Sequence, residues 1–340
     1  MTLASALQVV RARLGSAVPL SVGFELTHLC NLACSYCDRH TPMPDEMSLE
    51  EIRVALDGLH ELGMRHLSLD GGEPLAHRNI EQVVDHLAGF GDMRLFMNTN
   101  GILVPRKLDV VRRLARVKIS LDGPAAAHDA MRGARAHERA LRGAQAARDA
   151  GVAVEFTCVV GEHNVEHLDE LLDQVERLGL SIVFQPARNS LFLDTERDGA
   201  AFVPEAVRMR AAFARLEQRK HAGAPVGNRW SSLRHFRNYP DDAPIPCAAG
   251  RINVTLDPAG NLYHCGQVNR GDTSCNVRRL GTHEAFRRLT REPCQQCWCA
   301  RVVEENYAWG GRLDRMLPAR RREAPPVVSR PAPRRRLPLA

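Results

Sequence analysis

Short apolar segments alternate with longer amphipathic segments along the first two thirds of the chain. The apolar segments are rich in valine, isoleucine and leucine and end in turn residues, which predicts buried β-strands. Six strands are expected, at residues 24–29, 66–70, 93–98, 117–121, 152–160 and 181–185. The segments between them carry apolar residues at helical spacing. They predict helices over residues 49–62, 79–88, 105–115, 137–150 and 165–178.

Local signals support several of these boundaries. Ser48 and Glu51 form the pattern of a capping box at the start of a helix, and Gly63 is placed to end it. Further helices are expected over residues 4–14 and 203–219. Near the C-terminus, two short apolar segments at 252–256 and 262–264 are joined by Asp-Pro-Ala-Gly, which predicts a β-hairpin.

The alternation of strands and helices indicates parallel βαβ units and an α/β fold. Both a Rossmann-like open sheet and an incomplete barrel fit the alternation. Unusual polar residues follow the first four strands, and in a barrel all these strand ends face one mouth. We therefore expect a partial (β/α)6 TIM-like barrel with a small cysteine-rich module. The expected division is an N-terminal extension at 1–19, the barrel at 20–219, a linker at 220–246, the module at 247–317 and a disordered tail at 318–340.

Composition limits the classes of partner. The net charge of the 340 residues is +6, and the Arg/Pro-rich segment 318–340 alone carries seven arginines and one glutamate, so the rest is formally neutral. A basic balance confined to a tail argues against nucleic acid as the main partner. No apolar run reaches the roughly 18 residues of a membrane span, and no signal-peptide pattern is present. These features predict a cytoplasmic protein, whose ten cysteines would then serve metal binding or catalysis.

Three of the cysteines follow the first strand. Cys30, Cys34 and Cys37 have the spacing C-x3-C-x2-C. Three thiolates in so short a loop can hold three irons of a four-iron cluster and leave the fourth iron without a protein ligand, and an open metal position is typical of a catalytic site. Zinc is the local alternative, because His28 or His40 could supply a fourth ligand.

This loop, with the aromatic Tyr36 before its last cysteine, resembles the signature loop of the radical S-adenosylmethionine (radical SAM) enzymes. In that family the open iron binds the amino and carboxylate groups of SAM. After the second strand, Gly71, Gly72, Glu73 and Pro74 resemble the GGEP motif of the family. The resemblance implies that this segment contacts the SAM amino group.

The later strand ends carry further residues of the resemblance. Asn98 ends the third strand, and Ser120 ends the fourth in the sequence Ile-Ser-Leu-Asp-Gly-Pro. The resemblance implies that Ser120 lies near the SAM ribose or carboxylate and that Arg132 pairs with that carboxylate. It also implies that Val160, with Val159, flanks the adenine. Short polar residues equally suit plain turns, and Arg132 equally suits a helix surface.

A second set of cysteines lies beyond the barrel. Cys247 is followed by twelve residues, Gly260, four residues and Cys265, and later by Cys294-x2-Cys297. The spacing from Cys247 to Cys265 resembles the start of the SPASM or twitch module of radical SAM enzymes. The resemblance implies one auxiliary [4Fe–4S] cluster, held by Cys247, Cys265, Cys294 and Cys297. The full SPASM spacing is not continued. Structural zinc is the alternative, because four thiolates suit tetrahedral zinc as well.

Three cysteines remain after this count. Cys299 could replace Cys297 as a ligand. Cys158 lies in a predicted strand and is expected in the core. Cys275 has no assigned role. At the end of the sixth strand, Gln185 and Arg188 are candidates for substrate contact.

The resemblance implies an enzyme that cleaves SAM reductively and abstracts hydrogen from a substrate through a 5′-deoxyadenosyl radical, with electrons from an external flavodoxin- or ferredoxin-type donor. The single predicted auxiliary cluster resembles the twitch type and favours an oxidation or bond-forming reaction on a small natural-product or cofactor precursor. Only about 20 residues precede the first strand, too few for a fused precursor-binding domain. The alternatives are a peptide or protein maturase, acting on a ribosomal peptide or in the manner of a sulfatase maturase, and a non-catalytic zinc-binding protein. The sequence singles out no catalytic side chain.

Overall fold

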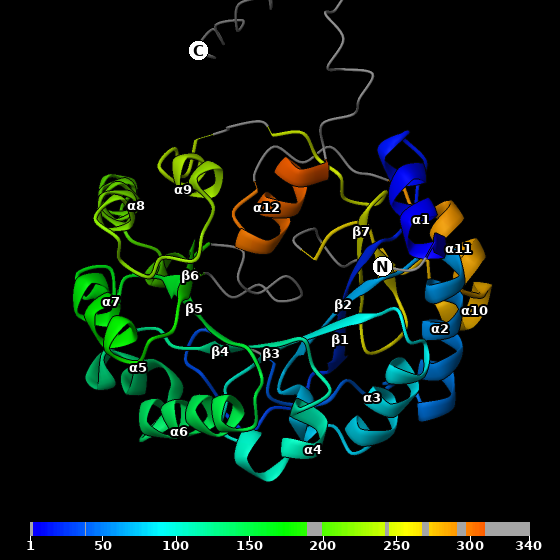
Figure 1. The fold of residues 1–340 in the computed structure, drawn as a ribbon, viewed down its shortest axis with the longest axis horizontal. Coiled ribbons are helices and arrows are strands. Elements are labelled where there is room, and N and C mark those ends of the chain that lie inside the picture. Colours follow the sequence, from blue (N-terminus) through cyan, green and yellow to red (C-terminus); the bar gives the residue numbers. More distant parts are fainter. Residues whose placement is uncertain are drawn as a thin grey trace, which may run out of the picture.

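The computed structural model describes residues 3–37, 39–188, 199–241, 245–266, 272–290 and 297–309. Six parallel strands form a curved sheet with helices on its outer face (Figure 1). The strands are β1 Ser21–Thr27, β2 His66–Gly71, β3 Arg94–Thr99, β4 Arg116–Ser120, β5 Val154–Val160 and β6 Ile182–Pro186. The expected partial (β/α)6 TIM-like barrel is therefore confirmed.

The barrel helices follow their strands in the predicted alternation. They are α2 Leu49–Leu62, α3 Ile80–Gly89, α4 Leu108–Val111, α5 Ala125–Arg132, α6 Ala136–Asp149, α7 Leu168–Arg177 and α8 Ala206–His221. Helix α1 (Leu3–Arg13) precedes the barrel, and short 3-10 turns lie at Pro74–Ala76, Val104–Arg106 and Ala200–Phe202. The capping box of α2 is present, with Gly63 in the left-handed region at its end, as predicted.

The core lies between the sheet and its helices. On β4, Val117 and Ile119 are fully buried in that core. Because successive side chains on a strand point to opposite faces, Lys118 and Ser120 lie on the inner face, where they line a cavity of about 710 Å³. The strand register thus places apolar side chains outward and polar side chains inward, and it is the inner set that defines the site.

The sheet continues past β1 into the C-terminal module. Strand β7 (Asn253–Leu256) pairs in parallel with β1, and β8 (Leu262–Tyr263) returns antiparallel to β7. The predicted hairpin is confirmed, but the pattern of apolar residues did not show that the hairpin extends the barrel sheet. The short helices α10 (Val277–Leu280) and α11 (Thr282–Arg288) follow and pack near α2.

Helix α12 (Ala300–Trp309) crosses the side of the barrel that the sheet leaves open, opposite β3 and β4 (Figure 1). At one edge, the Ala300 N–H donates to Oε1 of Gln185 on β6 over 3.1 Å. At the other edge, the Ser21 hydroxyl on β1 donates to Oε1 of Glu305 over 2.6 Å. The C-terminal module therefore supplies one wall of the barrel interior.

Two predicted segments differ from the structure, and one helix was missed. The helix expected at 105–115 is only the short α4, because Ala115 N–H already bonds to Leu95 O (2.8 Å) to begin β4. Helix α5 was not predicted. The expected linker at 220–246 contains helix α9 (Trp230–Phe236), which packs on α8 through a ring contact between Phe213 and Phe236. The tail predicted at 318–340 lies outside the described residues.

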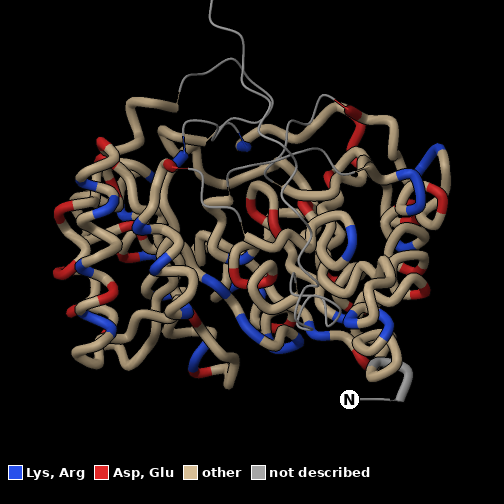
Figure 2. Tube along the Cα trace, turned by 90° about the horizontal axis from the view of Figure 1, so that it is seen from above, with Lys and Arg blue, Asp and Glu red and all other residues tan. Residues whose placement is uncertain are grey.

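Basic and acidic positions are interspersed along the helices (Figure 2). Many form ion pairs between neighbouring elements, such as Arg219 of α8 with Asp173 of α7 at 2.6 Å. None of the helices in the described part of the chain has the length and hydrophobicity that a membrane-spanning segment requires.

Candidate active site

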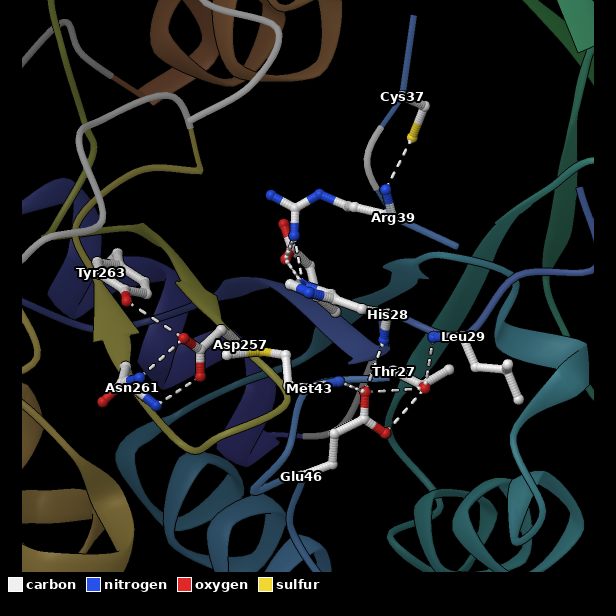
Figure 3. A network of polar contacts seen from close by, with 11 residues as sticks. Thr27, His28, Leu29, Cys37, Arg39, Met43, Glu46, Asp257, Asn261 and Tyr263 are labelled. Atoms are coloured by element: carbon white, nitrogen blue, oxygen red, sulfur yellow. Dashed lines mark hydrogen bonds and ion pairs between the residues drawn. The ribbon is translucent and has the colours of Figure 1, made fainter. Parts of the chain in front are cut away.

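The loop after β1 carries Cys30, Cys34 and Cys37, and a carboxylate outside the loop holds its beginning. Glu46 accepts hydrogen bonds from the Thr27 hydroxyl (2.9 Å), from the His28 N–H (2.8 Å) and from the Met43 N–H (3.0 Å). Figure 3 shows the Glu46 carboxylate between these three donors. The chain direction into the cysteine loop is fixed by this contact.

Within the loop, all three thiols are half-buried. The Cys37 N–H donates to Cys34 O over 3.0 Å, which forms a tight turn between the two cysteines. Two N–H donors lie near sulfur: the Arg39 amide is 3.4 Å from the Cys37 sulfur, and the Asn100 side-chain amide is 3.8 Å from the Cys30 sulfur. Such donors stabilise thiolate charge.

The environment of Cys30 and Cys34 favours the neutral form of their thiols. Burial, together with charge repulsion from Glu73, Cys34 and Cys37, raises the pKa of Cys30 to about 11, although a backbone hydrogen bond from Leu32 opposes the shift. Burial also raises the pKa of Cys34, although Arg132 opposes the shift. Three thiolates would therefore need a cationic partner, which an iron–sulfur cluster provides. Among the described residues, no three His, Cys, Asp or Glu side chains converge closely enough to surround a single metal ion.

The double glycine after β2 is required by close approach of the backbone. A Cβ on Gly72 would lie 2.4 Å from Leu29 O and 2.6 Å from His28 O, and a Cβ on Gly71 would lie 2.3 Å from Thr27 O. Gly71 also has a φ of +117°. The motif therefore packs directly against the start of the cysteine loop.

Glu73 is fully buried, and protein donors occupy its carboxylate. The Thr99 hydroxyl (2.8 Å), the Asn100 N–H (2.9 Å) and the Leu75 N–H (3.1 Å) all donate to it. Burial raises its pKa, while these donors oppose the shift. The side chain joins the end of β2 to the end of β3. The side chain of Asn100 then reaches Asn31 in the cysteine loop over 2.7 Å.

Asp122, just after β4, accepts hydrogen bonds from three separate parts of the site. It accepts from Arg132 Nε (2.6 Å) and from the Tyr36 hydroxyl (3.1 Å) on one oxygen, and from the Val159 N–H (3.1 Å) on the other. Despite burial, the Arg132 charge lowers the pKa of Asp122. Arg132, at the end of α5, is thus a largely covered side chain, 12% exposed, that pairs with a buried carboxylate, and the plain surface position considered for it is wrong.

The remaining predicted strand-end residues divide between cavity and core. Asn98 and Ser120 line the cavity, and Asn98 donates to the Ser68 hydroxyl over 3.2 Å. Val160, however, is fully buried in the hydrophobic core, and its neighbour Val159 lines the cavity. Alternation along β5 explains the difference, since adjacent residues face opposite sides of a strand.

A polar ligand is also indicated by His163, in the loop after β5. Both ring nitrogens are buried and have no hydrogen-bond partner among the described residues. The ring stacks with Tyr36, with centroids 6.3 Å apart. A buried nitrogen without a partner costs free energy, so the His163 ring favours a hydrogen-bonding partner that the described residues do not supply.

Four cysteines of the C-terminal module gather around one small apolar cluster, which contains Tyr263 and Val302. They are Cys247, Cys265, Cys297 and Cys299. The Asn306 side-chain amide donates toward the Cys297 sulfur over 3.6 Å. Cys294 lies outside the described residues.

The other two cysteines lie in the large core. Cys158 is 1% exposed and accepts from Asn164, and Cys275 is 8% exposed. The prediction that Cys158 is a core residue is confirmed. Of the substrate candidates, Gln185 holds α12. Burial lowers the pKa of Arg188, and the module cysteines near it oppose that shift.

Glu46, Asp122 and Asn100 are the site residues that sequence reasoning missed or left as turn residues. Asp122 and Asn100 stand at strand ends next to predicted site residues, and that position is a usable signal. Glu46 lies in an irregular segment, and nothing in the local pattern distinguishes it.

Comparison with known proteins identifies the family. The model of the radical SAM superfamily matches residues 24–175. The chain is 28% identical over 292 residues to PqqA peptide cyclase of Streptomyces rochei, covering 83% of this chain and 76% of the relative. It is 33% identical over 276 residues to a probable GTP 3′,8-cyclase of Halobacterium salinarum, covering 73% and 74%.

A solved structure agrees in fold. Native anSMEcpe with bound AdoMet and Cp18Cys peptide superposes with a TM-score of 0.63 and 18% identity, over 79% of this chain and 80% of that chain. The family match over residues 24–175 begins within β1 and includes the cysteine loop, the Gly-Gly turn, Asp122 and Arg132. With its signature loop and partial barrel, the chain belongs to the radical SAM superfamily and is a radical SAM enzyme.

Proposed function

We propose that this enzyme modifies a peptide substrate with the help of one auxiliary iron–sulfur cluster. The observation that carries the proposal is the extent of similarity to PqqA peptide cyclase, which covers 83% of this chain and so cannot be confined to the barrel. The expectation of a small-molecule substrate rested on the cysteine count and the short N-terminal extension. The peptide alternative is now better supported.

In this proposal Cys30, Cys34 and Cys37 hold a [4Fe–4S] cluster. The backbone of Gly71 and Gly72 contacts the SAM amino group, since the Glu73 side chain is already engaged by protein donors. When bound, the cluster and SAM supply reductive cleavage of SAM and a radical that abstracts hydrogen. The electron donor is proposed to be a flavodoxin or ferredoxin.

The side chains around SAM would orient it and exclude water. Tyr36 and His163 border the adenosine, with Val159 and Ser120 on the cavity side. Arg132 keeps its salt bridge to Asp122 and presents its remaining N–H groups toward the SAM carboxylate. Each of these contacts is a proposal from the positions of the residues.

The auxiliary cluster would take its ligands from Cys247, Cys265, Cys297 and either Cys294 or Cys299. Support for Cys299 comes from its contact with the same apolar cluster as the other three. Helix α12 begins directly after Cys299 and forms a wall of the cavity. The cluster would therefore lie close to a bound substrate, where it can accept an electron from it.

The test uses anaerobically reconstituted enzyme with SAM, a reductant and a short peptide encoded beside its gene. The expected result is 5′-deoxyadenosine together with a mass change on the peptide, and deuterium transfer from the labelled residue into 5′-deoxyadenosine. SAM cleavage with no change in any neighbouring peptide, but with consumption of a nucleotide, would contradict the proposal.

Modification of a nucleotide is the second candidate function. The 33% identical relative is a probable GTP 3′,8-cyclase, and its similarity covers 73% of this chain. GTP therefore serves as the small-molecule substrate to include in the same assay.

A further inference from the structure

The cavity wall of β4 and β5 carries two cations and one carboxylate. Arg116 Nη1 lies 3.2 Å from Glu155 Oε1, and Lys118 Nζ lies 3.4 Å from Glu155 Oε2. Glu155 faces Lys118 across the β4–β5 register and is buried. The pairing leaves one positive charge without a matching carboxylate on this wall.

Lys118 is the better placed of the two cations. Its side chain is 25% exposed and lines the cavity, whereas that of Arg116 is 44% exposed at the start of the strand. An ammonium group has three N–H donors. Glu155 is the one partner of Lys118 among the described residues. A partly desolvated cation with unused donors favours a negatively charged ligand.

Other cations that line the cavity already have carboxylates of their own. Arg39 pairs with Glu25 at 2.8 Å, and Arg132 pairs with Asp122 at 2.6 Å. Arg301 pairs with Glu305 at 3.2 Å and lies beside Asp70, so two carboxylates surround that one cation. Arg229, which also lines the cavity, lies 3.9 Å from Glu304. Among the described cations of the lining, the excess positive charge is therefore confined to β4.

The position of Lys118 along β4 determines how far it lies from the proposed SAM site. It lies two residues before Ser120, at the strand end where SAM is proposed to bind. Two residues of a strand span roughly 7 Å. A substrate group bound by Lys118 would therefore lie about two peptide residues away from the part of the substrate that faces the proposed SAM site.

We propose that Lys118, assisted by Arg116, binds a carboxylate of the substrate. The peptide nature of the substrate rests on the proposed function. The substrate class is then a peptide segment with an acidic group about two residues from the modified position. That carboxylate comes either from an Asp or Glu side chain or from the C-terminus of the peptide, and the two sources share one chemistry.

The test measures binding of three small probes to the anaerobically reconstituted, SAM-loaded enzyme. N-acetylglycine presents a terminal carboxylate, N-acetylglutamic acid α-amide presents a side-chain carboxylate, and N-acetylglycinamide is neutral. The expected result is that one acid binds about tenfold more tightly than the neutral amide, a typical gain for a charge-assisted contact. The acid that binds better identifies the source.

Variants separate the site from non-specific charge effects. Lys118→Gln should weaken binding of the preferred acid about tenfold, and Lys118→Arg should retain most of it. Lys107→Gln is the matched control, because Lys107 pairs with Glu81 at 2.9 Å outside the cavity. Retained SAM affinity and cluster absorbance in Lys118→Gln would show that the variant is folded.

Equal binding of acids and amide, or no acid binding up to roughly 50 mM, would overturn the proposal. So would unchanged acid binding in folded Lys118→Gln. The measurement requires no turnover. Acid binding without peptide modification would therefore refute the proposed function alone, and peptide modification without acid binding would refute this inference alone.

Discussion

Two carboxylates outside the cysteine loop determine its conformation at the scale of single residues. Glu46 holds the entry to the loop, and Asp122 holds Tyr36 within it. Each carboxylate gathers donors from separate parts of the chain, so the loss of either would leave buried N–H or O–H groups without acceptors. Such groups cost about 1–3 kcal/mol each.

Glu46→Gln should therefore loosen the loop while leaving the barrel folded. The neutral amide replaces one acceptor oxygen by a donor, which opposes the Thr27, His28 or Met43 donors. We expect lower iron content after reconstitution and faster loss of cluster absorbance with a chelator. Glu50→Gln is the control, because its side chain is 77% exposed on α2. Equal cluster retention in both variants would refute the role of Glu46.

His128 should make stability depend on pH. Burial and the nearby Arg132 lower its pKa from 6.5 to about 4, and its Nδ1 accepts the Asp122 N–H over 3.0 Å. The unfolded chain takes up a proton near pH 6.5 and the folded chain only near 4, so this contribution is lost as pH falls through that interval. The full effect is about 3 kcal/mol.

The measurement compares urea unfolding at about pH 7.5 and about pH 5.5. Wild type should lose about 1 kcal/mol more than His128→Asn, which keeps an acceptor but does not titrate. His283→Asn, at an exposed position, should behave as wild type. An identical pH response of His128→Asn and wild type would contradict the assignment.

Sequence patterns predicted the residues of this site better than their contacts. Cys30, Cys34 and Cys37 follow from spacing alone. The partner of Arg132 does not, because a guanidinium fits the SAM carboxylate or Asp122 equally well. Which of Val159 and Val160 faces the cavity depends on the strand register, because successive side chains face opposite sides of the strand. Two adjacent apolar residues do not show which of them faces the cavity.

At the scale of elements, the ends of β1 and β2 are in direct backbone contact. Gly72 N–H donates to Thr27 O over 2.8 Å, and Glu73 N–H donates to Leu29 O over 2.8 Å. The cysteine loop therefore begins on a surface made by the Gly-Gly turn. Any side chain at the turn would separate the two.

Gly72→Ala should disrupt this junction. The added Cβ would lie 2.4 Å from Leu29 O, a backbone atom that cannot move without shifting the cysteine loop. We expect a loss of about 2 kcal/mol or more in stability and a marked loss of SAM affinity in equilibrium dialysis. Gly89→Ala is the matched control, because its Cβ would meet nothing within 4 Å. SAM binding by Gly72→Ala at the wild-type level would refute the argument.

Elements were predictable where the pattern was long and the boundaries were marked. Helix α2 has both a capping box and a terminal glycine, and the structure matches it. Helix α9 was missed because seven residues with a mixed composition give little periodicity. The pairing of β7 with β1 was not predictable, since more than 200 residues separate the two strands and no local signal links them.

At the scale of the whole molecule, α12 joins the auxiliary cysteines to the barrel. Arg301 projects from it toward Gly23 and Asp70 and pairs with Glu305. This half-buried cation links the C-terminal module to β1 and β2. This wall of the cavity thus lies on one continuous segment with Cys297 and Cys299, two of the cysteines proposed to hold the auxiliary cluster.

Arg301→Met should weaken this link. Glu305 and Asp70 would lose their shared cation. The side chains of Arg301 and Glu305 are 25% and 19% exposed, so we expect a cost of about 1–3 kcal/mol, between that of a surface pair and that of a fully buried pair. Hydrogen exchange should increase in α12 more than in α6. The double variant Arg301→Met/Glu305→Gln should recover part of the loss, whereas Arg287→Met, 72% exposed, should have little effect. Unchanged exchange in α12 would contradict the link.

The position of α12 also sets an order for assembly during synthesis. The cysteine loop forms from the first 40 residues, but the wall opposite β3 and β4 is supplied only by residues 300–309. A nascent chain therefore carries the cysteine loop in a barrel that is open on this side until residues 300–309 have left the ribosome. This side of the cavity can be closed only after the segments that carry the cysteine loop and the Gly-Gly turn have been made.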